Sequence, residues 1–127
     1  MLDANDSFFS TVKLAGGGVA TVHATRWATG QVNSLRVRVF GDKGAVELDL
    51  DRSLTDYRRA STRKAMQPAA WKDVRAPKVP NQYQRFIAAV RSGVSDESDF
   101  VNGARVQACL DASFLSDRQR RPVIVTA

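Results

Sequence analysis

The sequence predicts an α+β domain in which an open, mainly antiparallel β-sheet carries two helices packed on one face. Three observations lead to this class. Much of the first half of the chain alternates apolar and polar residues with the period of a strand. Glycine-rich turns separate these stretches, and after residue 80 the apolar period becomes that of a helix.

The clearest element is a hairpin over residues 34–51. Its first arm alternates apolar residues with Arg36 and Arg38, and its second arm alternates them with Glu47 and Asp49. A Gly-Asp-Lys-Gly sequence between the arms predicts a tight turn, because glycine adopts turn conformations closed to other residues. Each arm has one apolar and one charged face, so the two arginines can lie opposite the two acids, which favours this pairing.

Two further strands are predicted before the hairpin, over residues 7–14 and 19–27. The three glycines at 16–18 connect them as a hairpin turn. A phosphate-binding loop is not expected there, since no helix follows and no Gly-Lys-Ser/Thr ending is present. One face of the second strand carries His23 and Trp27, which suits contact with solvent, a ligand or another subunit.

The region after the hairpin contains short strand-like pieces at 56–60 and 71–75, and prolines interrupt it. Helical periodicity begins at Asn81 and ends at Gly93. A second helix is predicted over 99–118, with Phe100 pointing inward and Cys109 on its apolar face. An apolar stripe of the first helix consists of Tyr83, Phe86, Ile87 and Val90.

The chain is predicted to end in a short edge strand over residues 123–125. The strands, two helices and last strand together leave one sheet face uncovered. An uncovered face with apolar and aromatic residues is a candidate interface between subunits.

The composition is that of one globular domain covering residues 1–127, with 43% hydrophobic residues and no apolar run near the roughly 20 residues that span a bilayer. No membrane partner is therefore expected. The single Cys109 excludes an internal disulfide and a cysteine metal cluster, and we expect no metal site. The first ten residues have no basic and apolar leader pattern, so a cytoplasmic location is expected.

The formal net charge is +6, and 14 of the 19 basic residues are arginines. They concentrate at 58–64 and 118–121. Such clusters can bind polyanions, or they can form an ordinary solvated surface. Because no nucleic-acid motif accompanies the charge, nucleic acid is not the expected partner. A basic module that binds nucleic acid or an acidic protein stays open as the alternative function.

The run VATVHATRWATGQVNSLRVRVFGDKGAVELDL resembles the C-terminal domain of the glucose–fructose oxidoreductase / inositol dehydrogenase / MocA (Gfo/Idh/MocA) oxidoreductases. In that family a strand ending in a basic residue leads through a polar loop to a strand, a G-[DET]-K-G turn and another strand. The later F-x-x-G-x-x-x-Q-x-x-x-x-A pattern is similar to the family's helix, and begins here at Phe100. The resemblance implies a dihydrodipicolinate-reductase-like C-terminal domain.

Family members resemble two-domain dehydrogenases whose N-terminal Rossmann domain binds NAD or NADP. This chain has no G-x-G-x-x-G fingerprint opening a strand–helix unit and no Glu-Lys-Pro segment, and His23 lacks the family's aspartate four positions earlier. The resemblance therefore implies a chain truncated on its N-terminal side, without catalytic or cofactor-binding residues. The Rossmann domain would come from the same or a neighbouring gene.

By this resemblance the chain is the substrate-binding and dimerisation domain of an NAD(P)-dependent oxidoreductase acting on a sugar or polyol, and it is inactive alone. Gln31 and Asn33 occupy the loop that reaches the substrate in polyol-binding relatives; a turn role for Asn33 and a solvated Gln31 are the alternatives. Arg26 could bind a substrate carboxylate or phosphate, or form a structural ion pair. His23 and Trp27 would contribute to a homodimer through the open sheet face.

Overall fold

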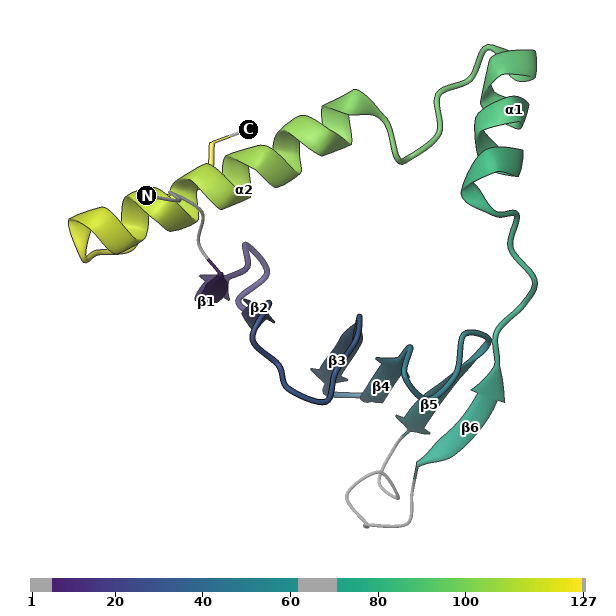
Figure 1. The fold of residues 1–127 in the computed structure, drawn as a ribbon, viewed down its shortest axis with the longest axis horizontal. Coiled ribbons are helices and arrows are strands. Elements are labelled where there is room, and N and C mark those ends of the chain that lie inside the picture. Colours follow the sequence, from purple (N-terminus) through teal and green to yellow (C-terminus); the bar gives the residue numbers. More distant parts are fainter. Residues whose placement is uncertain (1–5, 62–70, 127) are drawn as a thin grey trace. The chain divides into compact units, whose positions relative to one another are not determined.

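A computed structural model describes residues 6–61 and 71–126 and confirms the α+β class. It contains two antiparallel sheets and two helices (Figure 1). The chain forms two compact units, described separately below. The first holds residues 6, 25–61 and 71–79, and the second holds residues 7–24 and 80–126.

The first unit is built on a four-stranded antiparallel sheet. Its strands follow the chain in the order β3-β4-β5-β6. Their bounds are Arg36–Gly41 for β3, Gly44–Asp49 for β4, Asp56–Ser61 for β5 and Lys72–Arg75 for β6. The predicted hairpin forms β3 and β4, and the two strand-like pieces form β5 and β6.

The hairpin has the predicted register, with Arg36 opposite Asp49 and Arg38 opposite Glu47. Gly44 closes the turn with a φ of 148°, a backbone conformation that favours glycine. A Cβ at Gly44 would overlap the carbonyl oxygen of Ala60 on β5. Glycine at this position therefore permits both the turn and the close approach of the next strand.

Because ladder partners share a face, the register divides the side chains of this sheet into two sets. The charged face carries Arg36, Arg38, Glu47, Asp49, Asp56, Arg58, Asp73 and Arg75, with Phe40, Ala45 and Ala60 at one end of it. The apolar face consists of Val37, Val39, Val46, Leu48, Tyr57 and Val74, with Arg59 and Lys72 at one end of β5 and β6. Val37, Val39, Val46 and Leu48 are exposed, and Val74 is half-buried.

The second unit contains a two-stranded sheet and both helices. Their bounds are Ser7–Lys13 for β1, Val19–Thr25 for β2, Gln82–Ser92 for α1 and Phe100–Gln119 for α2. Gly17 turns between β1 and β2 with a φ of 87°, and the Leu14 N–H donates to the Gly18 carbonyl over 2.8 Å. The glycine triplet is thus a hairpin connection, as predicted.

Both helices begin with side-chain caps. Asn81 accepts a hydrogen bond from the Gln84 N–H, and the Gln84 side chain accepts one from the Asn81 N–H, which forms a capping box for α1. Gly93 ends α1 in the left-handed conformation. Asp99 caps α2 through the Asn102 N–H. The predicted helix boundaries are therefore confirmed to within two residues.

Three expectations need correction or a narrower statement. Residues 121–126 form neither helix nor strand, so the predicted closing strand over 123–125 is wrong. After α2 the chain turns at Arg120, whose φ is 53°, and Pro122 has no N–H to donate to a ladder. The described strands form two sheets instead of one open sheet. The packing of the helices on a sheet face stays a prediction.

The apolar side chains of both helices are exposed. Phe100 of α2, expected to point inward, is 98% exposed. Cys109, also expected on an apolar face of α2, is exposed as well. Neither helix has the length and apolar character that crossing a bilayer would require. The helices therefore present exposed apolar surface in the described part of the chain.

Candidate functional site

The loop between β2 and β3 carries the residues predicted to meet a substrate. The Gln31 N–H donates to the Ala28 carbonyl over 2.9 Å, and Gly30 has a φ of 86°, so a tight turn presents Gln31. The Ser34 hydroxyl donates to the Gln31 Oε1. This hydrogen bond holds the exposed glutamine side chain on the loop through its oxygen.

Asn33 lies in the same loop and is exposed. No hydrogen bond from its side chain to another described residue is found, so the turn-satisfying role considered for it has no support in the described region. Gln31 and Asn33 together present amide groups that can donate to and accept from hydroxyl groups. Ser34, which orients Gln31, was missed by sequence reasoning, although its spacing of three residues from Gln31 is typical of turns.

Arg26 begins this loop. Its backbone N–H donates to the Asp6 carbonyl over 2.8 Å, while its side chain is exposed. No ion pair joins Arg26 to a carboxylate of the described residues. The structural ion pair considered for Arg26 is therefore not found in the described part of the chain.

The two predicted interface residues lie in different units. His23 on β2 contacts the ring of Phe9 on β1, with ring centroids 6.4 Å apart. Trp27 is 77% exposed, and its backbone N–H donates to the Thr25 hydroxyl. Both residues are exposed, so both are accessible to another protein.

The charged face is held by ion pairs that cross the strands. Arg38 on β3 and Arg58 on β5 bind opposite oxygens of Glu47 over 2.6 and 3.2 Å. Asp49 pairs with Arg36 over 2.7 Å. Glu47 is only 7% exposed, so this acid is the centre of the face. Acids neutralise these arginines, which reduces the basic charge available to a polyanion.

The pKa values of the two central acids follow from these contacts. Partial burial raises the pKa of Glu47, but the hydrogen bonds and charges of Arg38 and Arg58 outweigh it and hold that pKa below its ordinary value. Burial likewise raises the pKa of Asp49, and Arg36 and the Asp51 N–H lower it further than burial raises it. Both side chains are therefore stabilised as carboxylates, which suits ion pairing and does not suit a general acid.

Trp71 extends the charged face beyond the start of β6. The Arg58 guanidinium carbon lies 5.2 Å from the centre of the Trp71 ring, in cation–π contact. This explains Trp71 as a packing residue for Arg58. Sequence reasoning missed this pair, because the two residues become neighbours only once β5 and β6 are in register.

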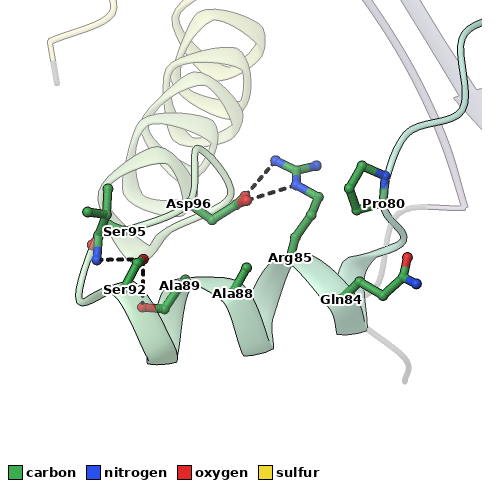
Figure 2. A pocket seen from close by; sticks show the side chains of 9 residues that line it. Pro80, Gln84, Arg85, Ala88, Ala89, Ser92, Ser95 and Asp96 are labelled. Atoms are coloured by element: carbon green, nitrogen blue, oxygen red, sulfur yellow. Dashed lines mark hydrogen bonds and ion pairs between the residues drawn. The ribbon is translucent and has the colours of Figure 1, made fainter.

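An open depression of about 520 Å³ lies between α1 and the segment that follows it (Figure 2). Figure 2 shows Arg85 of α1 pointing at Asp96, and both Asp96 oxygens accept from its guanidinium, over 2.6 and 2.8 Å. The Ser98 N–H, followed by Arg85, lowers the pKa of Asp96. The depression is thus bordered by a closed ion pair, which holds the α1–α2 connection and leaves no free charge for catalysis.

No cluster of three or more metal-binding side chains is found within residues 6–61 and 71–126. Paired acids, a polar loop and exposed apolar surface are the features that the described residues present. Together with the antiparallel sheets and the capped helices, they characterise an α+β domain.

Comparison with known proteins identifies the family. Residues 2–125 match the model of the oxidoreductase family, C-terminal alpha/beta domain, so the chain belongs to that family as its C-terminal domain, and the predicted Gfo/Idh/MocA resemblance is confirmed. A crystal structure of an oxidoreductase domain protein from Kribbella flavida has the same fold, with a TM-score of 0.78 and 21% identity over 92% of this chain. The match covers 36% of that protein. A search of curated proteins gives no match.

Proposed function

We propose that this chain is the substrate-binding and dimerisation domain of an NAD(P)-dependent oxidoreductase that acts on a sugar or polyol. The family match over residues 2–125 carries the proposal. In the parent enzyme a hydride would pass between an alcohol carbon of the substrate and the nicotinamide. The cofactor and the catalytic base would belong to the Rossmann domain, so this chain by itself has no dehydrogenase activity.

The loop between β2 and β3 supports the substrate part of the proposal. Gln31 and Asn33 are exposed amides two residues apart, and each can both donate and accept, as a sugar hydroxyl requires. Arg26 adds a guanidinium that pairs with no acid of the described residues. These three side chains would orient the substrate from the second domain, while the Rossmann domain supplies the reacting groups.

A titration followed by NMR tests this part directly. Addition of myo-inositol or glucose should shift the backbone amide signals of residues 26–35. Replacement of both amides, Gln31→Ala with Asn33→Ala, should abolish the shifts. A matched control is Gln107→Ala, because Gln107 is an exposed glutamine on α2 that bonds only to Asp111 among the described residues. Shifts that persist in the double variant would contradict the assignment of this loop.

Exposed apolar and aromatic side chains support the dimerisation part. Trp27 and three valines of the apolar face, Val37, Val39 and Val46, are exposed in the described chain. Apolar surface of this kind is typically covered by other protein, and a second copy of the chain is the partner we propose.

Sedimentation equilibrium measures the proposed self-association. The native chain should sediment as a dimer, and Trp27→Arg should shift it toward the monomer. Trp71→Phe is the control, since it keeps an aromatic ring beneath Arg58 and lies outside the proposed contact. A native chain that stays monomeric at high concentration would refute the dimer without affecting the substrate loop.

A further inference from the structure

Six basic residues lie within the strands of the four-stranded sheet: Arg36, Arg38, Arg58, Arg59, Lys72 and Arg75. Four of them pair with carboxylates of the charged face, through Asp49, Glu47 and Asp56. Arg59 and Lys72 are the two that form no ion pair within the described part of the chain. The sheet therefore distributes its acids unevenly between its two faces.

Arg59 and Lys72 are also direct partners in the β5–β6 ladder. Like charges at directly opposed positions repel, and this arrangement is normally avoided in sheets. All four acids of the sheet strands, Glu47, Asp49, Asp56 and Asp73, belong to the charged face. No strand acid can thus relieve the repulsion on the apolar face.

A third polar group lies beside this pair. Tyr57 precedes Arg59 by two residues on the same face of β5, and its ladder partner Val74 follows Lys72 by two residues on β6. The side chains of Tyr57, Arg59 and Lys72 therefore project on one side of two adjacent strands. A guanidinium fork, an ammonium and a phenol hydroxyl together offer donors in several directions and two positive charges.

We propose that Arg59, Lys72 and Tyr57 form a binding site for a phosphoryl group, as inorganic phosphate or as a phosphate monoester of a small molecule. A dianion cancels both cationic charges, whereas a carboxylate cancels one of them. Its three or more oxygens can accept from all three side chains. The site lies at one end of β5 and β6 on the apolar face, whose valines also belong to the proposed dimer contact, and it involves neither the β2–β3 loop nor Trp27.

The first test compares anions on the full chain at constant ionic strength. Sodium phosphate should raise the thermal unfolding midpoint more than sodium acetate does, and should shift the amide signals of Tyr57, Arg59 and Lys72 in NMR spectra. The affinity for glucose 6-phosphate is compared with the affinity for free phosphate, and glucose is the unphosphorylated control. Tighter binding of the sugar phosphate than of phosphate would identify a phosphorylated metabolite as the ligand. The reverse order would identify free phosphate, and either order supports a phosphoryl site.

Matched variants locate the site. Arg59→Gln and Lys72→Gln should each weaken phosphate binding at least tenfold, because each removes one of two cations. Arg75→Gln is the control, since Arg75 lies on the opposite face of the sheet and pairs with Asp56. Lys72→Arg keeps the charge and should keep the binding. If the Lys72→Gln chain failed to fold, the Lys72→Arg and Arg59→Gln results would decide whether these residues bind phosphate.

One further variant separates a ligand site from simple repulsion. Lys72→Glu places an acid opposite Arg59, so it should raise the stability of the free chain and abolish the response to phosphate. Equal stabilisation by phosphate and acetate, or phosphate binding that survives Arg59→Gln, would overturn the proposal.

Discussion

The two faces of the four-stranded sheet arise from the same alternating sequence but meet their surroundings differently. On the charged face, acids and arginines from neighbouring strands neutralise one another, and Glu47 is nearly buried between two arginines. On the apolar face, valines stay exposed, and Arg59 faces Lys72 without a strand acid beside them. The charged face therefore stabilises the sheet, while the apolar face is available for binding.

This difference between the two faces changes the functional interpretation of the charged residues in the sequence. A cluster of arginines and acids at strand spacing suggests a catalytic or polyanion-binding surface. Register converts most of them into cross-strand pairs that are worth little individually when exposed. The residues that lack such partners among residues 6–61 and 71–126, Arg26, Arg59 and Lys72 among them, are better candidates for contact with a ligand.

The largest expected effect comes from the glycine that allows β4 to lie against β5. Gly44→Ala should reduce the free energy of unfolding by at least about 2 kcal/mol, because alanine is strained at the φ of 148° and its Cβ would overlap the Ala60 carbonyl. Urea unfolding of the full chain measures the loss. Gly41→Ala is the control, as its Cβ would lie 3.7 Å from the nearest backbone atom and should be tolerated.

The next effect tests the centre of the charged face. Glu47→Gln removes the acid shared by Arg38 and Arg58, so the unfolding midpoint should fall by several degrees. Asp73→Asn, which loosens only an exposed pair with Arg52, should lower it much less. Equal falls of the unfolding midpoint in the two variants would show that Glu47 stabilises the charged face no more than Asp73 does.

Much of this arrangement could be predicted from the sequence. The hairpin and its register followed from the alternation and the Gly-Asp-Lys-Gly turn, because both are local signals. The pairing of Glu47 with Arg58 could not be read in the same way, since it needs the register between β4 and β5. The short apolar run at 123–125 led to a wrong strand prediction for a related reason. Its three β-branched residues favour extended backbone whether or not a neighbouring strand is present.

The features of the candidate site also separate into those that the sequence predicted and those that only the structure showed. Gln31 and Asn33 were identified as loop residues by sequence, and the structure describes both as exposed. The ion pair between Arg85 and Asp96 escaped sequence analysis, since the two residues meet only through the turn at Gly93 that ends α1. Long-range contacts of this kind depend on tertiary geometry, which local spacing does not encode.

Acid should weaken the charged face selectively. The folded pKa values of Glu47 and Asp49 lie below their ordinary values of 4.5 and 3.8, so the stability that these acids provide is present at neutral pH. It is lost as the pH falls below those ordinary values and through the lower folded pKa values. Unfolding free energies measured from neutral to acidic pH should therefore decline, with a smaller decline in Glu47→Gln. An unchanged decline in that variant would assign the acid sensitivity to other groups.

The smallest effect lies outside the sheet and provides a contrast to it. Arg85→Lys keeps the charge near Asp96 but loses the two parallel hydrogen bonds, which should lower the stability only slightly because the pair is partly exposed. Amide hydrogen exchange at Ser98 should become faster, because its N–H bonds to the same carboxylate. Unchanged exchange would show that Asp96 holds the connection without Arg85.

The central claim is that this domain binds the substrate and leaves the dinucleotide to another domain. Fluorescence titration of NADH with the purified chain tests it most directly. The account predicts no saturable change in nicotinamide fluorescence at micromolar protein, and likewise none for NADPH. A saturable enhancement with micromolar affinity would place a cofactor site within these 127 residues and contradict the account.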